Sequence, residues 1–496
     1  MKFRSAEAGT GPRPRTVLAL LALFVVINAA DKAVLGLTAG PVQDELGLTA
    51  TQFGTIASSF YLLFSLSAVS VGFLGDRIRP RPLLAALALV WAAAQLPILL
   101  PAAGYGALIA TRVVLGAGEG PGYPLANHTA FTWFPEKRRA LPSAVVVAGG
   151  AGGTVVAAPL VLLVTDTLGW RAAFGLLGAA GLVWTAAWLR FGGGGPYHAH
   201  PGASQAAPSP TGTESTAARP RAVPVAGEAG SVSVEAEVYA APADTPPGPA
   251  TVLRPAPADT TSRPAPVPFW RIVITGTWLG ATLSTFAVMW TLALGFAWLP
   301  LYLEEQAGFG DAVVGVIVGL PALAMAVLVL TAGAVAHRLL RGGTSARVAQ
   351  GLLGAVLPLL AGVCLLLVTR VGPAPLLLPL LVLAFSAGNG QTPLTNAAVA
   401  DICPPARRSA ALGLSYALAA LSSLLAPYVT GRIIDAAPTE AVGYGRAFDL
   451  AGWLLIGGAL LAALLIRPDR DARALGTAGR PAGPTAPAGP TTHPKE

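Results

Sequence analysis

The sequence predicts an all-α membrane protein with twelve transmembrane helices in two pseudo-symmetric six-helix bundles. Three observations predict this class: an apolar composition, about twelve apolar stretches of spanning length, and a Pro- and Gly-rich segment that divides them six and six. Hydrophobic residues make up 54% of the chain, charged residues 11%, and the mean hydropathy is +0.63. Because soluble domains carry roughly 25% charged residues, the composition alone points to a membrane protein.

Each apolar stretch is close to the roughly 20 residues that a helix needs to cross the hydrocarbon core. The stretches are uniformly apolar and do not alternate, which favours helices over the strands of a membrane barrel. The expected spans are 16–37, 52–74, 82–102, 106–126, 141–164, 170–190, 281–303, 312–336, 346–369, 374–399, 409–432 and 447–466.

The spans and the segments between them predict four parts of the chain. The segment 192–268 begins with four glycines, contains fifteen of the 44 prolines and has no periodicity, so we expect a disordered cytoplasmic linker. The expected parts are an N-terminal bundle at 1–191, this linker at 192–268, a C-terminal bundle at 269–467, and a disordered cytoplasmic tail at 468–496.

The net charge of +8 reflects membrane topology and does not indicate a nucleic-acid partner. Arginines and lysines cluster on alternate connections, and basic loops stay cytoplasmic, so both termini are expected inside a multi-pass protein of the inner membrane. The first apolar stretch continues past Lys32 to Leu37, so we interpret it as a retained helix and not as a cleaved signal peptide. Cys364 and Cys403 suggest neither a disulfide nor a metal site, and no cofactor or metal is expected.

The first and fourth apolar spans contain four ionisable residues at a depth where charge is costly and usually functional. Asp31 and Lys32 are in the first span, and the chain has only three other lysines. Arg112 and Glu119 are seven residues apart, two helical turns, and so lie on nearly one face of the fourth span. Two interpretations stay open: internal salt bridges that fix helix packing, or a polar cavity that binds an anion and moves protons.

A weak internal repeat follows the second span of each half. Residues 72–81 read Gly-Phe-Leu-Gly-Asp-Arg-Ile-Arg-Pro-Arg, and residues 333–341 read Gly-Ala-Val-Ala-His-Arg-Leu-Leu-Arg. The first copy resembles the signature of the major facilitator superfamily, Gly-x-x-x-Asp-Arg-x-Gly-Arg-Arg, and departs from it at Arg79 and Pro80. The resemblance implies a cytoplasmic gate, while a merely solvated basic loop is the alternative. The residues expected in the gate are Gly72, Asp76, Arg77, Arg81 and Arg338.

Within that superfamily the chain is similar to the anion:cation symporter branch, which includes sugar-acid, phthalate and sialic-acid carriers. The stretches that carry this resemblance are 112–120 (Arg-Val-Val-Leu-Gly-Ala-Gly-Glu-Gly), Tyr123-Pro124, 133–135, 137–140, 169–174 (Gly-Trp-Arg-Ala-Ala-Phe), 298–303 (Trp-Leu-Pro-Leu-Tyr-Leu) and Ala426-Pro427 with Gly431 and Asp435. The resemblance implies that Asp31 and Glu119 carry protons. It also implies an anion site, although the branch usually has Arg where Lys32 stands.

The remaining site candidates are polar or aromatic groups inside apolar spans. Lys32 is a point charge able to hold a carboxylate, Arg112 offers a bidentate fork, and protonation of Asp31 would free Lys32 for the substrate. Uncharged polar groups orient a ligand in a cavity wall, while interhelical hydrogen bonding is the alternative for each. The further candidates for substrate binding are Asn28, Trp298, Asn389, Gln391 and Thr392. The hydroxyls lacking at Ala29 and Phe64, where the branch often has Tyr, favour an anion less hydroxylated than an aldonate.

The sequence therefore predicts a secondary transporter and not an enzyme, because it contains no catalytic triad, no Walker loop and no zinc-ligand spacing. We expect proton-coupled symport of a small organic carboxylate by alternating access, with the anion, protons and the lipid bilayer as partners and a monomer as the working unit. Two alternatives remain open: a proton-coupled efflux antiporter of the same fold, and a transport-inactive membrane sensor or scaffold.

Overall fold

The computed structural model describes residues 14–75, 80–134, 140–196, 267–371 and 375–477. These ranges are helical, with short 3₁₀ and π turns and no strand. Within the same ranges, nine helices are long and apolar enough to cross a membrane. The all-helical class predicted from the composition is therefore confirmed.

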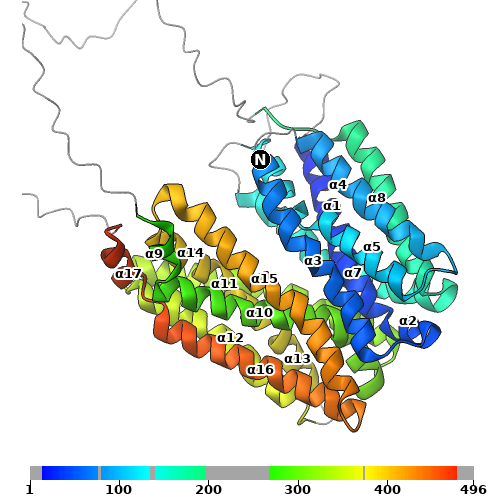
Figure 1. Ribbon diagram of the computed structural model, residues 1–496. Helices are drawn as coiled ribbons and strands as arrows, with labels where there is room; N and C mark the ends of the chain where they lie inside the picture. The colour runs from blue at the N-terminus through cyan, green and yellow to red at the C-terminus, as the bar shows by residue number, and fades with distance from the viewer. Residues whose placement is uncertain (1–13, 76–79, 135–139, 197–266, 372–374, 478–496) are drawn as a thin grey trace, which may run out of the picture. The chain divides into compact units, whose positions relative to one another are not determined.

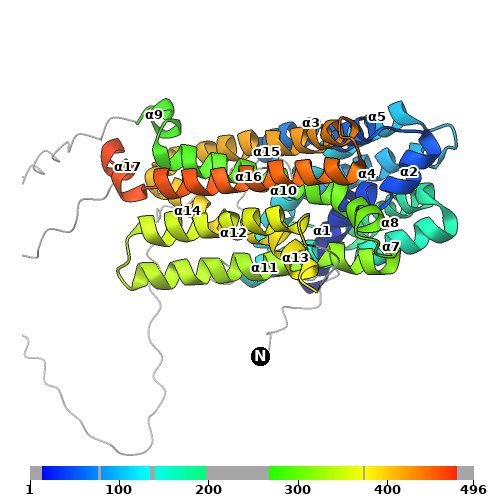
Figure 2. The same ribbon diagram turned by 90° about the horizontal axis from the view of Figure 1, so that it is seen from below.

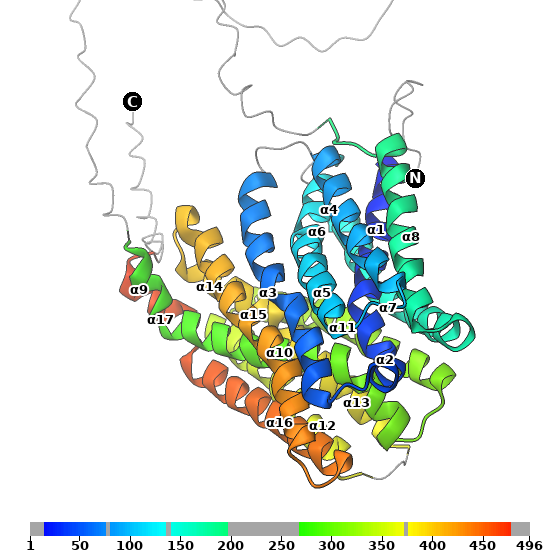
Figure 3. The same cartoon turned by 45° about the vertical axis from the view of Figure 1, so that its right-hand side comes forward.

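The first half of the chain forms one helical bundle (Figure 1, blue to green-cyan). Its elements are α1 (Pro14–Leu37), α2 (Ala39–Leu46), α3 (Ala50–Gly75), α4 (Pro80–Gln95), η1 (Leu96–Leu99), α5 (Tyr105–Glu119), α6 (Gly122–Phe131), α7 (Ala140–Leu168) and α8 (Trp170–Phe191). Within it, α1 packs against α7 and α8, α3 against α5, and α4 against α8. Figure 3 shows α4, α5 and α8 lined up beside α1.

The second half repeats this order in another bundle. Its elements are α9 (Phe269–Val273), α10 (Gly276–Leu301), η3 (Tyr302–Gln306), α11 (Asp311–Arg341), η4 (Arg347–Leu352), α12 (Leu353–Val368), α13 (Leu377–Ser386), η5 (Ala387–Gln391), α14 (Thr392–Ile402), α15 (Pro405–Asp435), α16 (Glu440–Leu465) and α17 (Pro468–Leu475). Here α10 packs against α15 and α16, and α12 against α16. Figure 2 shows α16, α12 and α11 running side by side.

Three of the twelve expected spans are not among the nine long apolar helices counted in the described residues. The span 52–74 falls on α3, the span 106–126 on α5 and α6, and the span 374–399 on α13, η5 and α14. The α5–α6 break follows from Pro121, which cannot donate a main-chain hydrogen bond to continue the helix.

The tail expected to be disordered from Pro468 begins instead with a helix, so this boundary was placed too early. In α17, Asp471 is buried and accepts hydrogen bonds from the main-chain N–H and the hydroxyl of Thr277 at 2.8 and 2.7 Å. Burial favours the neutral acid, but these bonds and one from Arg470 hold the pKa of Asp471 below its usual value. The carboxylate thus fixes α17 to the start of α10. The rest of the expected tail, from residue 478, and the expected linker between 197 and 266 lie outside the described residues.

The buried apolar side chains of the described residues are arranged differently at the two ends of the helices. At one end a continuous core joins both halves, including residues 30–37 of α1, 157–162 of α7, 287–301 of α10 and 444–455 of α16. At the other end each half has a core of its own, one around Trp91, Trp184 and Trp188 and one around Trp278 and Ile402. We call these the closed end and the split end.

Three pairs of long helices connect the halves, α1 with α10, α3 with α15, and α7 with α11, and the short helix α2 also contacts α10. The α1–α10 and α3–α15 pairs approach closely, because a Cβ at Gly36 would lie 2.0 Å from the Phe296 carbonyl oxygen and one at Gly54 would lie 2.3 Å from the Pro427 carbonyl oxygen. At the closed end, Asp435 accepts hydrogen bonds from the main-chain N–H groups of Ala50 and Thr51 at 3.1 and 2.8 Å. A carboxylate from one half thereby caps the positive N-terminus of a helix of the other. We call this contact the α3–α15 clamp.

Within the first bundle, Gly116 of α5 lies where α5 and α3 approach closely. If alanine replaced it, the added Cβ would lie 1.9 Å from the Phe60 carbonyl oxygen of α3. Gly116→Ala should therefore destabilise the bundle by about 1–3 kcal/mol, because packed helices must separate. The thermal midpoint of the purified protein measures this loss.

Gly457→Ala is the matched control, since nothing lies within 4 Å of a Cβ at Gly457 on α16. It should leave the midpoint unchanged or raise it, because alanine is favoured over glycine inside a helix by about 1 kcal/mol. Equal midpoints for the two variants would contradict the packing described above.

Candidate functional site

The site begins on α1, where the polar residues Asn28, Asp31 and Lys32 interrupt an otherwise apolar helix. Asn28 and Asp31 are buried, while the Lys32 side chain keeps 22% of its surface exposed. Residues four apart lie one above the other on a helix. The Lys32 ammonium accordingly donates a 2.7 Å hydrogen bond to Asn28 Oδ1, which orients its charge along the helix.

The fourth predicted span brings Glu119 to this ammonium. Glu119 ends α5, is 1% exposed, and places Oε2 at 3.9 Å from Lys32 Nζ. Neither carboxylate oxygen of Glu119 has a hydrogen-bond partner among the described residues. A buried carboxylate without hydrogen bonds is costly, so Glu119 relies on nearby cations for compensation, and Lys32 is the one at ion-pair distance.

Asp31 takes part in a different set of contacts. Its Oδ1 accepts a 2.8 Å hydrogen bond from Gln95 Nε2 at the end of α4, and its Oδ2 has no partner among the described residues. Arg112 Nη1 donates to the main-chain oxygen of Asp31 at 3.2 Å, and its guanidinium lies 4.8 Å from the centre of the Phe174 ring. The structure thus gathers the four predicted ionisable residues into one buried cluster.

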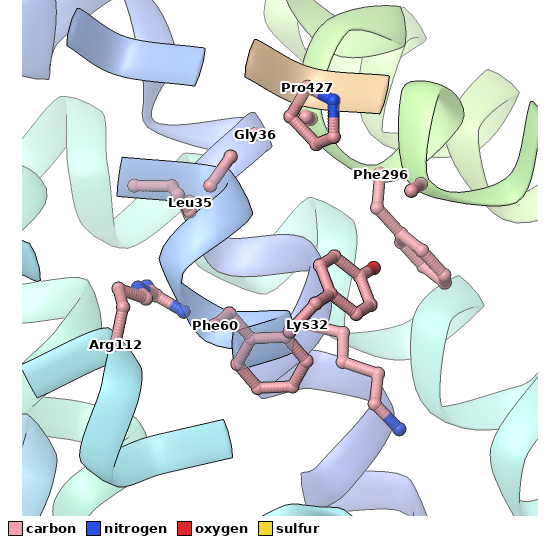
Figure 4. Close-up of a pocket in the computed structure, with 11 residues that line it drawn as sticks. Lys32, Leu35, Gly36, Phe60, Arg112, Phe296 and Pro427 are labelled. Carbon is pink, nitrogen blue, oxygen red and sulfur yellow. The ribbon is translucent and has the colours of Figure 1, made fainter. Parts of the chain in front are cut away.

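The expected competition between Asp31 and Lys32 needs correction. The carboxylate in ion-pair distance of Lys32 is that of Glu119, whereas the Asp31 side chain bonds to Gln95. Neighbouring residues project about 100° apart around a helix, so the two side chains leave α1 in different directions. Figure 4 shows the Lys32 ammonium pointing away from Arg112.

A cavity of about 600 Å³ lies beside this cluster, between the two halves. Asn28 and Lys32 line it from the first half, together with Tyr61 and Phe64 of α3. Across the cavity, helices α10, α11, α13 and α15 supply the opposing wall. Arg112 reaches only a small adjoining pocket of about 20 Å³, which Lys32 also lines (Figure 4).

The other predicted substrate residues lie away from this cavity. The Trp298 indole is fully buried and donates a 3.2 Å hydrogen bond to the Pro427 carbonyl, which places it between α10 and α15. Gln391 accepts a 2.6 Å bond from Ser284 inside the second bundle. Asn389 and Thr392 belong to the same η5–α14 segment, and neither lines the cavity.

The predicted gate is described only in part. Asp76 and Arg77 lie outside the described residues, and Gly72 falls near the end of α3. Arg81 donates to the main-chain oxygen of Leu189, and its own main-chain oxygen accepts a 3.0 Å bond from the Trp188 indole. Arg338 is an exposed residue near the end of α11.

Sequence reasoning missed Gln95 and most of the opposing wall. Gln95 is 2% exposed and was one polar residue in a long apolar stretch. The one available signal for a role in the site was that Gln95 is a polar residue between two apolar runs. The wall residues Phe296, Phe385 and Met325 gave none, because every face of these helices is apolar and periodicity does not mark the cavity side.

Comparisons with known proteins bear on this site. A model of the Major Facilitator Superfamily matches residues 21–388. A D-galactonate transporter of Escherichia coli O6:H1 is 26% identical over 459 residues, covering 92% of this chain and 97% of its own. A probable sulfoacetate transporter of Cupriavidus necator is 26% identical over 336 residues, covering 68% of this chain and 67% of its own.

Among solved structures, a bacterial homologue of the human lysosomal transporter Spinster superposes with a TM-score of 0.66. The identity is 16%, and the match covers 94% of this chain and 99% of the other, which supports the shared fold. The predicted resemblance to the anion:cation symporter branch agrees with the curated relatives. The chain is a multi-pass transporter of the inner membrane and not an enzyme, and it belongs to the major facilitator superfamily.

Proposed function

We propose that this chain is a twelve-helix secondary transporter that carries a small organic carboxylate into the cell together with protons. The observation that carries the proposal is the buried Lys32–Glu119 pair at the edge of the 600 Å³ cavity. Relatives named as transporters of D-galactonate and sulfoacetate, both organic acids, support an anionic substrate.

The pair suggests how proton and anion binding are coupled. When Glu119 is ionised, its carboxylate forms an ion pair with the Lys32 ammonium, with Oε2 at 3.9 Å from Nζ. A proton on Glu119 removes that negative charge and leaves Lys32 free to hold a substrate carboxylate from the cavity side. When Glu119 loses its proton, the ammonium returns to it and the substrate is released. Asp31 is the second proposed proton carrier, because its Oδ2 has no partner among the described residues.

The distribution of charge supports an orientation in the membrane. Arg15, Arg81 and Arg467 mark the split end, whereas Glu45 and Asp311 mark the closed end. By the positive-inside rule the split end and both termini face the cytoplasm. The cavity then belongs to an inward-facing state, in which the closed end seals it from outside.

Alternating access requires the closed end to open. The α3–α15 clamp must break when the halves rock apart, because Asp435 and its donors belong to different halves. The clamp is proposed to favour the inward-facing state over the outward-facing one. This role is distinct from that of the predicted gate at Asp76, which would favour the opposite state.

Lys32 is expected to hold the substrate charge. Lys32→Gln should lower proton-driven uptake in proteoliposomes by about thirtyfold or more, since a buried charged partner is lost. Lys32→Arg should retain part of the activity because it keeps the cation. Because Lys32→Gln leaves Glu119 unpaired, the double variant with Glu119→Gln serves as a folding check. Wild-type uptake by Lys32→Gln would dismiss this role.

Glu119 is expected to carry a coupled proton. Glu119→Gln should preserve counterflow of substrate but abolish accumulation against a gradient, because the amide cannot bind and release a proton. Accumulation driven by an inward proton gradient measures this, and it also separates uptake from the efflux alternative.

Glu45→Gln is the matched control for Glu119→Gln. Hydrogen bonds from Trp170 and Arg171 hold the pKa of Glu45 below its usual value, so this carboxylate stays ionised at neutral pH and carries no proton. Normal accumulation is expected there. Normal accumulation by Glu119→Gln as well would make Glu119 a structural residue.

Asp435 is expected to set the balance between the two access states. A carboxylate at a helix N-terminus contributes about 1 kcal/mol, so Asp435→Asn should raise the outward-facing population about fivefold. Labelling of Leu299→Cys by a membrane-impermeant maleimide from outside measures that population, because Leu299 lines the cavity and Cys364 and Cys403 are buried. Asp449→Asn removes an ion pair with Arg370 inside the second half, so it should not change the rate at which the maleimide labels Leu299→Cys. An equal rate for both variants would refute the clamp.

A further inference from the structure

The two walls of the cavity differ in chemistry. The wall from the second half presents rings, thioethers and aliphatic groups, and among the described lining residues its only hydroxyls are those of Tyr416 and Ser423. The Ser423 hydroxyl already donates to the Met289 carbonyl at 3.3 Å. No carboxylate, amide or cation of the described second half reaches the cavity.

The first half supplies the charged side of the cavity. Lys32 is the one charged side chain among its described lining residues. The second cation of the cluster, Arg112, is turned to the Asp31 carbonyl and the Phe174 ring. The cavity is thus equipped to neutralise one negative charge. A second anionic group would be buried there without a partner, which is strongly unfavourable.

A polyhydroxylated ligand does not fit these walls. A sugar acid carries a hydroxyl on nearly every carbon, and each hydroxyl buried without a partner weakens binding by about tenfold. The polar groups available to pair with them lie mainly on the first half, at Asn28, Tyr61, Tyr123 and Thr154, so the ligand hydroxyls that face Met289, Met325 or Phe296 across the cavity find no partner. The apolar wall would therefore reject the ligand that a D-galactonate transporter is named for.

A ring or alkyl body does fit. Phe64 lies under the Lys32 ammonium, with its ring centre 5.4 Å from Nζ, so a carboxylate held there meets an aromatic surface at once. Phe296 and Phe385 line the cavity from the other half, and aromatic walls favour stacked or edge-on rings. Met325 adds an adaptable thioether to the same wall. The volume of about 600 Å³ has room for a ring and a short chain.

We infer that the substrate is a monocarboxylate with an aromatic or other apolar body, and not a sugar acid. Its carboxylate binds Lys32, and its body lies against Phe296, Phe385 and Met325. This inference rests on the proposed function, since it names the class of anion that the Lys32 site takes.

Calorimetry on the purified wild-type protein tests it with matched acids. 3-Phenylpropionate should bind at least about tenfold more tightly than D-gluconate, which presents unpaired hydroxyls, and than phthalate, which adds a second charge. The neutral amide of 3-phenylpropionate should also bind at least about tenfold more weakly, because it lacks the charge that Lys32 holds. Equal or tighter binding of D-gluconate would overturn the inference.

Flux measurements separate this inference from the proposed function. If D-gluconate accumulates with an inward proton gradient and 3-phenylpropionate does not, the substrate class is wrong and the transport mechanism stands. If neither acid binds nor accumulates, both proposals fail. Accumulation of 3-phenylpropionate with exclusion of D-gluconate supports both.

Variants locate the selectivity in the second-half wall. Phe296→Gln should lower the preference for 3-phenylpropionate over D-gluconate by about tenfold, because it replaces a ring with a hydrogen-bonding amide. Phe191→Gln is the matched control, since Phe191 is exposed at the end of α8 and does not line the cavity. Met325→Gln is a second, nearly isosteric variant with the same expected direction, in case the first does not fold. An unchanged preference in folded Phe296→Gln and Met325→Gln would refute the role of this wall.

Discussion

The cost of burying charge in an apolar bundle governs this molecule. Asp31, Arg112 and Glu119 are each at most 3% exposed, and Lys32 is the one member of the cluster with its side chain partly open to the cavity. Their compensation is incomplete, because the described residues leave oxygens of both carboxylates without hydrogen bonds. A cluster that served only to fix helix packing would be expected to satisfy its own groups. Under the proposed function, partial compensation at the edge of a cavity leaves room for exchange of protons and of an external anion.

The arrangement of the cores gives this cluster its setting. One continuous core joins the halves at the closed end, while separate cores stabilise each half at the split end. The halves can therefore separate at one end without unfolding, and the cavity occupies the depth at which they part. Close helix approaches at Gly36 and Gly54 and the cap formed by Asp435 hold the halves together at the closed end. A contact of that kind has a defined broken state, as a two-state transporter needs.

Much of the architecture follows from the sequence because lipid imposes a simple rule on helix length and apolarity. The spacing of Arg112 and Glu119 also predicted their shared face, and the structure brings both to the first helix. The sequence did not predict that Glu119 is the partner of Lys32. Asp31 is next to Lys32 in sequence, but adjacent residues of a helix project about 100° apart, so their side chains point in different directions. The aromatic wall was equally hidden, since Phe296 and Phe385 lie in helices that are apolar on all sides. The helix α17 was missed because a short segment rich in Asp and Arg resembles a disordered tail until Asp471 meets Thr277.

The proposed division of labour between the halves has a mechanical consequence. Lys32, Glu119, Asp31 and Gln95 belong to α1, α4 and α5 of one half, so rocking of the halves does not by itself change the distances among them. Within that bundle, the contact between Lys32 and Glu119 then responds to protonation and to the anion, while the contact of the anion with the second half responds to rocking. The substrate is the element that connects the two responses, because its charge is held by one half and its body by the other. A ligand that binds Lys32 but does not fill the apolar wall would take part in the proton step without drawing the halves together, and it would be a poor substrate for that reason.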